Sequence, residues 1–314
     1  MINPMFKNPG CVAKRTDAKR AFTIIELLVA VGVTALLVSL MLGIVVNITK
    51  GWNRSSGSLE SGNQARLVLD QITSDLQSAI LRRDGNVWMS ANVQTASNAD
   101  WSGPASNTRF FPTTTPPKLE DYRFGPYGVW LRFFSTVPGT NVANDLTTLS
   151  APRAVAYQIV RIPVVAGSSE IRYQMFRSEV TPDVTFRIGY NLLDAKYTSV
   201  DDNGSLSIRR PPLDNVIGNN VVDFGVRIYE GTVLKFPTAT VDGYLATSDT
   251  TKAAGTVIVG MPDSVEVFVR ILSSEGAQQL ALLAESKITG DWWEIVEANS
   301  RVYTRRVDLK SKGL

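Results

Sequence analysis

The feature that most constrains this chain is an uncharged run of 22 residues, Leu27 to Ile48. At about 1.5 Å per residue, a helix of this length spans roughly 33 Å, enough to cross the hydrocarbon core of a bilayer. A secretory signal peptide has a shorter apolar region, of about 7–15 residues, and a clear small-x-small cleavage site, which is missing here. The run therefore predicts a transmembrane helix, and a plain single-pass anchor is its simplest form.

The charges of the chain indicate how this helix is oriented. Residues 1–21 carry five basic side chains and one acidic side chain, which leaves 27 basic and 28 acidic residues in the remainder. Because Lys and Arg beside a membrane segment stay on the cytoplasmic side, we expect the amino terminus in the cytoplasm. The remainder has a net charge of −1 and offers no basic surface, so no nucleic-acid partner is expected.

The chain contains one cysteine, Cys11, and no histidine. If residues 1–21 are removed, no cysteine remains and an intrachain disulfide is excluded. Without histidine there is no imidazole for a Ser-His-Asp triad, for a metal site or for a base that works near neutral pH. Carboxylate or lysine chemistry stays open, but the composition disfavours an enzyme. We expect neither enzymatic activity nor a cofactor.

An acidic residue, Glu26, stands at the entry to the apolar run. A charge inside a bilayer costs about 2.5–3.5 kcal/mol on insertion scales, so one that is kept there usually has a partner. Cleavage between Ala21 and Phe22 would supply a partner, because the new amino terminus is positively charged at neutral pH. The amine could pair with Glu26 of its own chain or of a neighbouring subunit, and pairing between neighbours would fix the register of packed helices.

Residues 21–30, A-F-T-I-I-E-L-L-V-A, resemble the processing signal of type IV pilins and type II secretion pseudopilins. The resemblance implies cleavage between Ala21 and Phe22 by a prepilin peptidase, and N-methylation of Phe22. It implies assembly through the residues that follow, namely Thr23, Ile25, Glu26, Leu27 and Leu28. Glycine usually precedes the cut in this family. Alanine is similarly small, so we expect slower or tolerated processing rather than none.

The remaining chain divides into three further segments beyond the leader at 1–21 and the assembly helix at 22–50. Residues 51–84 begin with a Ser- and Gly-rich stretch and continue with apolar residues three and four apart, which predicts an amphipathic helix with one buried stripe: Ala65, Leu69, Ile72, Leu76 and Ala79. Residues 85–127 have few periodic signals, and we interpret them as a loop-rich insertion with aromatic residues that dock on the body. Residues 128–314 are the predicted head domain.

The head has the composition of a β domain. Segments rich in Val, Ile, Tyr and Phe predict strands at 128–135, 153–165, 170–180, 221–230 and 264–272. In the last two, apolar residues alternate with polar ones such as Asp223, which predicts one exposed face. A helical pattern follows at 277–283 and a final strand at 301–309. One long helix followed by many strands predicts an α+β fold, with the helix packed on a mainly antiparallel sheet domain.

This layout adds a second resemblance. The order of segments, with short runs such as Pro262 to Val267 and Tyr303 to Val307, is similar to that of J-type minor pseudopilins and PilW-like minor pilins. Prepilin-like proteins of Verrucomicrobia-type gene cassettes share it. The large size of the head favours a subunit at or near the tip of a fibre, because a bulky head is hard to repeat along a tight fibre. The partners that the resemblance implies are other pilin-like subunits, the prepilin peptidase, the inner-membrane assembly platform and membrane lipid.

Two short motifs are candidates for further sites. Asp201, Asp202 and Asn203 resemble part of a calcium loop, but Ca²⁺ needs about six to eight oxygens and the run lacks the spacing and closing Glu of an EF-hand. A solvated Asn-Gly turn is the better interpretation. Trp292 and Trp293 are either an exposed contact patch or buried core residues.

The sequence thus predicts a minor pilin or pseudopilin of a type II secretion or type IV pilus-like fibre, located in the inner membrane. The alternative from another class is a membrane-anchored extracytoplasmic binding domain that uses a pilin-like anchor. A deep polar pocket with converging carboxylates or aromatic platforms would mark that alternative. A third interpretation, a major fibre-forming pilin, would be recognised by its abundance in sheared filaments.

Overall fold

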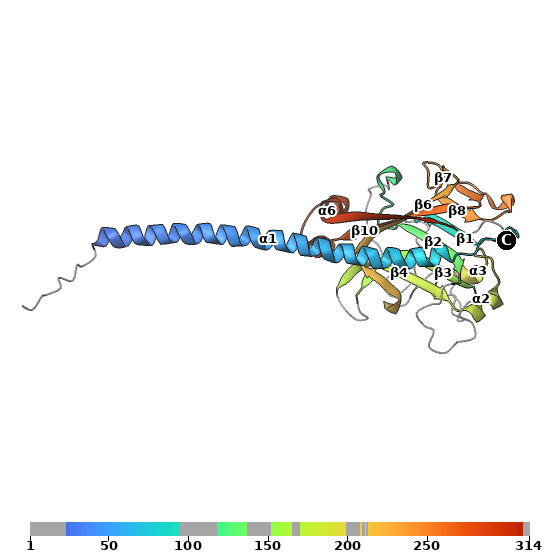
Figure 1. Cartoon of the computed structure of the whole chain (residues 1–314), viewed down its shortest axis with the longest axis horizontal. Helices are drawn as coiled ribbons and strands as arrows, with labels where there is room; N and C mark the ends of the chain where they lie inside the picture. Colours follow the sequence, from blue (N-terminus) through green and yellow to red (C-terminus); the bar gives the residue numbers. More distant parts are fainter. Residues whose placement is uncertain are drawn as a thin grey trace, which may run out of the picture. The chain divides into compact units, whose positions relative to one another are not determined.

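The computed structural model describes residues 23–94, 118–136, 152–164, 170–198, 208, 211 and 213–309. The chain divides into two compact units, residues 1–53 and 54–314, and the division falls within the long first helix, α1 (Ile24–Gln77) (Figure 1). The processing positions Ala21 and Phe22 lie outside the described residues, as do Asp201, Asp202 and Asn203.

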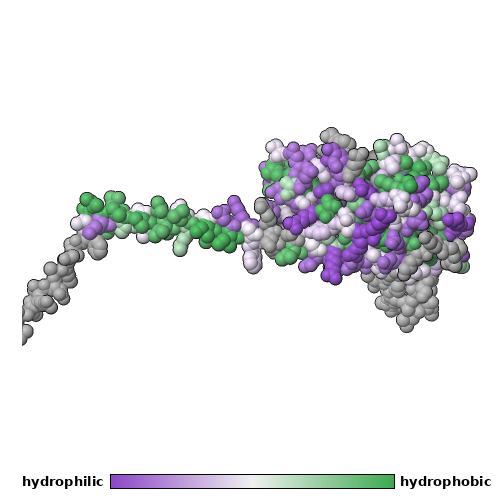
Figure 2. Space-filling model, turned by 45° about the horizontal axis from the view of Figure 1, so that its top comes forward, coloured by the Kyte–Doolittle hydropathy of each residue, from purple (hydrophilic) through white to green (hydrophobic). Residues whose placement is uncertain are grey.

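The described part of the first unit is apolar helix. Between Ile24 and Ile48 every large apolar side chain is 48–84% exposed, and the hydrophobic colour covers most of this part of α1 in the view of Figure 2. The stretch from Ile24 to Trp52 is long enough and apolar enough to cross a membrane. The predicted membrane-length helix is therefore confirmed.

The second unit contains two sheets. The larger has the order β5-β4-β3-β2-β1-β8-β9, with all neighbours antiparallel except the β8–β9 pair. The smaller has the order β11-β10-β6-β7 and is antiparallel throughout. The strands are β1 (Met89–Val93), β2 (Val129–Ser135), β3 (Arg153–Pro163), β4 (Ile171–Val180), β5 (Val216–Asn219), β6 (Val221–Glu230), β7 (Val233–Phe236), β8 (Gly243–Ala246), β9 (Val257–Gly260), β10 (Ser264–Leu272) and β11 (Ser300–Asp308).

Short helices connect these strands. They are η1 (Leu119–Asp121), α2 (Pro182–Ile188), α3 (Ala195–Thr198), η2 (Leu213–Asn215), η3 (Thr250–Lys252), α5 (Ser274–Ala284) and α6 (Trp292–Asn299). The helix predicted at 277–283 and the final strand predicted at 301–309 correspond to α5 and β11. The fold is α+β, with the second half of α1 packed on a mainly antiparallel β domain, as the sequence predicts.

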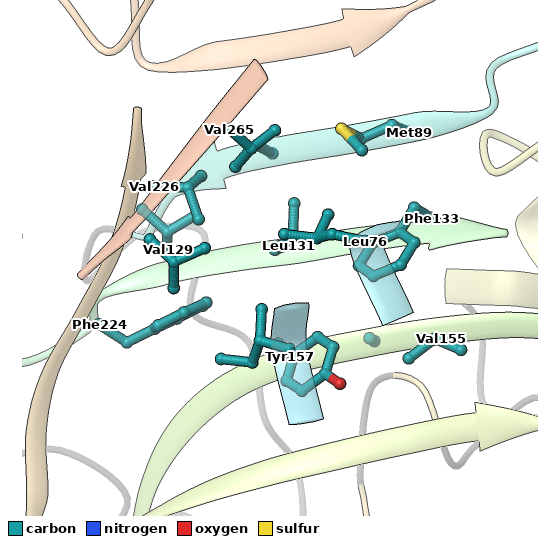
Figure 3. Close-up of a cluster of buried hydrophobic side chains, with 14 of the residues drawn as sticks. Leu76, Met89, Val129, Leu131, Phe133, Val155, Tyr157, Phe224, Val226 and Val265 are labelled. Atoms are coloured by element: carbon teal, nitrogen blue, oxygen red, sulfur yellow. The ribbon is translucent and has the colours of Figure 1, made fainter. Parts of the chain in front are cut away.

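The second half of α1 packs against the core through one stripe of buried side chains. The predicted stripe residues Ala65, Leu69, Ile72 and Leu76 are each no more than 5% exposed. Figure 3 shows Leu76 among side chains of the larger sheet, including Leu131, Phe133 and Tyr157. Burying a Leu or Ile side chain contributes about 1.5–3 kcal/mol, so this stripe is a major source of stability for the head.

Two predicted boundaries differ from the structure. The helix predicted to continue to residue 84 ends at Gln77, and Ala79 instead pairs with Ser135 in an isolated β-bridge. The stretch 85–127, interpreted as a loop-rich insertion, contains β1, which lies between β2 and β8 inside the larger sheet. Trp88 just before it is buried, in agreement with the expected docking of aromatic residues.

The outer face of the smaller sheet, predicted to be exposed, is partly covered: Asp223 and Phe268 are buried, whereas Arg227, Glu266 and Arg270 are half-buried. The ring of Phe124 lies against Gly225, where a Cβ atom would come within 1.9 Å of the ring. Helix α6 buries Trp292 and Trp293, so the core interpretation of this pair is confirmed and the exposed patch is wrong. Asp291 begins α6, because its carboxylate accepts hydrogen bonds from the N–H groups of Trp293 and Glu294.

Candidate functional site

The first candidate site is the amino-terminal end of α1. The Glu26 carboxylate accepts hydrogen bonds from the Thr23 N–H at 2.9 Å and the Thr23 hydroxyl at 3.0 Å. The Glu26 N–H donates to the Thr23 hydroxyl oxygen at 3.2 Å. This reciprocal arrangement is a capping box, which satisfies N–H groups that a helix leaves unpaired at its start. The sequence contains its signature, T-x-x-E before an apolar run, and reasoning from charge alone missed it.

Capping does not use the whole carboxylate of Glu26. Both bonds from Thr23 fall on one oxygen, Oε2, and an ionised carboxylate has about four acceptor sites. The predicted assembly residues Ile25, Leu27 and Leu28 lie on either side of Glu26 and are 62–75% exposed. The described segment therefore presents an acidic group with spare acceptor capacity beside a continuous apolar surface.

A second polar group is buried between α1 and the larger sheet, and the sequence did not predict it. We call it the buried ionic cluster; its members are Asp75, Tyr157, Arg177, Glu179 and Arg153. Arg177 donates from Nε to Asp75 Oδ2 at 2.7 Å and from Nη2 to Oδ1 at 3.3 Å. The Tyr157 hydroxyl donates to the same Asp75 carboxylate. Arg177 also pairs with Glu179 at 2.7 Å, and Glu179 pairs with Arg153 at 3.4 Å.

The cluster balances its own charges, with two carboxylates and two guanidinium groups. Burial, followed by the charge of Asp75, raises the pKa of the Tyr157 hydroxyl well above its ordinary value, so the hydroxyl stays a donor. Asp75 was missed because it interrupts the apolar stripe between Ile72 and Leu76. A charged residue at a buried helical position is itself a signal, since such residues are rarely buried unless paired.

A third polar group lies where α6 and residues 118–125 cover the smaller sheet. Asp223, expected on an exposed face, is 2% exposed and accepts a hydrogen bond from the Phe124 N–H at 2.9 Å. The guanidinium groups of Arg123 and Arg270 lie 4.7 and 4.8 Å from the ring of Trp293. Burial raises the pKa of the Asp223 carboxyl to about 7, although the charge of Arg270 and the bonded N–H groups favour its ionised form.

This shift predicts a pH dependence of stability. The pKa of Asp223 is about 7 in the folded protein, against an ordinary value of 3.8. Between these values the folded protein holds a proton that the unfolded chain has released. The unfolding free energy therefore falls as pH rises from about 4 to 7, by at most about 1.4 kcal/mol per pH unit, and this contribution is constant above pH 7.

Urea unfolding of wild type and Asp223→Asn between pH 4 and 9 measures this contribution. The Asn side chain keeps an acceptor for the Phe124 N–H but does not titrate. We expect the wild type to lose stability relative to the variant up to pH 7. A difference between the two that does not change with pH would show that Asp223 titrates in its ordinary range.

Among the described residues, no group of three or more Asp, Glu, Cys or His side chains could hold a metal ion. A small pocket in the second unit is lined by Arg161, Arg172 and Asn220 and by apolar or aromatic residues of β4, β10 and α5, and no carboxylate lines it. Comparison of the chain with protein-family models and with the sequences of curated proteins found no match.

Proposed function

We propose that this protein is a structural subunit of the type IV pilin and pseudopilin class, of the minor type. In this proposal residues 22–50 insert into the inner membrane with the leader in the cytoplasm and the head outside. A prepilin peptidase cuts between Ala21 and Phe22, the new terminus is methylated, and the helix enters a fibre. The observation that carries the proposal is Glu26 at the start of an exposed, membrane-length apolar helix.

The geometry around Glu26 supports a role beyond capping. A capping box would be served equally by an uncharged Gln at this position, which adds no charge at the entry to an apolar helix. The carboxylate keeps acceptor sites after both bonds from Thr23 are made. A cationic amine from a neighbouring subunit, or from Phe22 of the same chain, is the partner that the spare sites and the charge fit.

The glycines of the apolar helix support packing against other helices. A Cβ atom at Gly32 or Gly43 would meet no atom within 4 Å, so nothing described in this chain requires glycine there. Glycine inside a helix costs about 1 kcal/mol relative to alanine. In membranes small residues allow helices to approach closely, and a neighbouring helix in a fibre would offset this cost.

Sequencing the amino terminus of the full-length protein, purified from cells with and without a prepilin peptidase, tests the proposal. We expect methylated Phe22 only where the peptidase is present, and a chain that begins at Met1 otherwise. Ala21→Gly restores the usual residue before the cut and should be processed faster. An uncut chain in both strains would overturn the proposal and favour the membrane-anchored binding domain.

A further inference from the structure

We propose that the buried ionic cluster is a register pin, which fixes the axial position of α1 on the larger sheet. This role does not rest on the proposed function, because Asp75 and the side chains that bind it all lie within the second unit.

The apolar contacts of α1 define its register weakly. The buried stripe residues recur every three or four positions, at Ala65, Val68, Leu69, Ile72 and Leu76. A shift of one turn, about 5.4 Å, would bring Ile72 to the place of Leu76 and Ala65 to that of Leu69. The same shift would bring Ser61 and Gln64 to the places of Ala65 and Val68, so Gln64 would lie against Gly218. The other three stripe positions would stay apolar, so the shifted helix keeps most of an apolar face against the sheet.

The registers differ in one respect: in the native register, side chains from three adjacent strands all bind one residue of α1, Asp75. Tyr157 on β3 and Arg177 on β4 bind the carboxylate of Asp75. Ser135 on β2 donates to the backbone oxygen of the same residue at 3.2 Å, one of the last carbonyls of the helix. Among the described side chains of α1 in the second unit, Asp75 is the buried charged one.

The same shift would put Gln71 where Asp75 lies. The Arg177 guanidinium and the Tyr157 hydroxyl would then face a neutral amide, which has one acceptor oxygen and no charge to balance the guanidinium, in a buried site. A buried charge that loses its partner is strongly disfavoured. The bidentate geometry of Arg177 on Asp75 adds a directional constraint that apolar packing lacks.

Disulfide trapping in the full-length chain tests the pin, with Cys11→Ser removing the natural cysteine. A Cβ atom at Gly57 would lie 3.7 Å from Ser273 Cβ, within the range for a disulfide, so Gly57→Cys with Ser273→Cys reports the native register. Asn53→Cys or Ser61→Cys with Ser273→Cys reports a helix displaced by one turn in either direction. The cluster is replaced by apolar groups in Asp75→Leu/Arg177→Met/Tyr157→Phe, which leaves Glu179 paired with Arg153.

We expect the native pair alone to form quickly in the wild type. In the apolar triple variant we expect one displaced pair to form at least ten times faster than in the wild type. Displaced pairs that stay at their wild-type rate while the native pair forms fully would overturn the proposal. If the triple variant does not fold, the rates of the displaced cysteine pairs are measured in Tyr157→Phe, which removes one bond to Asp75 and keeps both charges. The same two outcomes then support or overturn the proposal.

The exposed ion pair between α1 and β11 provides the matched control. Arg305 on β11 binds Asp70 on α1, and their side chains are 35% and 52% exposed. Asp70→Leu/Arg305→Met removes a charged link between the same helix and the other sheet. In this control variant, the displaced cysteine pairs should form at the wild-type rate. An equal rise in this control would show that register is not set by the buried cluster and would also overturn the proposal.

Discussion

Replacement of Asp75 by alanine should destabilise the head by about 3–5 kcal/mol. The substitution leaves the guanidinium of Arg177 and the hydroxyl of Tyr157 buried without the carboxylate that binds both. Removing one partner of a buried ion pair has this cost because the remaining charge stays desolvated. Arg177 keeps Glu179 at 2.7 Å, which places the expected value toward the lower end. Urea unfolding, followed by tryptophan fluorescence, measures the effect.

Asp70→Ala is the matched control for this result. Asp70 lies on the same helix and also binds an arginine, Arg305, but the pair is partly exposed to solvent. Ion pairs at the surface contribute about 0–1 kcal/mol, so this variant should remain close to wild type. Equal losses in the two variants would mean that the cost comes from the helix surface in general and not from the buried charge.

The fold could be predicted where a single period governs a segment. The alternation of Val265, Val267 and Val269 predicted β10, and all three side chains are buried. The spacing of Leu69, Ile72 and Leu76 predicted the inward face of α1. These patterns are local consequences of strand and helix geometry, so no knowledge of the rest of the chain is needed to interpret them.

The positions that were missed depend on contacts between distant segments. Asp223 alternates with apolar neighbours as an exposed residue would, and it is buried because residues 118–125 and α6 cover that face of the sheet. Strand β1 has only five residues, and its pairing with β2 and β8 determines its structure. Short strands carry little periodic information of their own, and tertiary pairing decides them.

The candidate sites divide in the same way. Glu26 was found because a charge beside a membrane-length apolar run conflicts with its surroundings. Its capping partner Thr23 was available from the T-x-x-E spacing but was not used. The buried ionic cluster joins residues 75, 157 and 177, which lie on three separate elements. Asp75 alone could have been suspected from the sequence, whereas its partners required the fold.

Replacement of Glu26 by glutamine should separate the observed capping role of this residue from the proposed pairing with a neighbouring amine. Glutamine can replace glutamate in a capping box, so α1 should begin at the same position and insertion and cleavage should continue. The charge that would neutralise a neighbouring amine is lost. An unpaired charge at a membrane helix costs about 2.5–3.5 kcal/mol, which corresponds to incorporation into fibres lower by on the order of a hundredfold. Quantitative immunoblotting of sheared fibres against total membrane protein measures it.

Two further variants make this result decisive. Thr23→Ala removes the hydroxyl that caps the helix and keeps the charge, so it should cost about 1 kcal/mol of local helix stability and leave incorporation within a few-fold of wild type. Glu26→Ala removes both roles and should incorporate no better than Glu26→Gln. If Glu26→Gln assembles normally and Glu26→Ala does not, the carboxylate serves only the capping box. The charge would then need no partner in a fibre, and the strongest support for a pilin-like subunit would be lost.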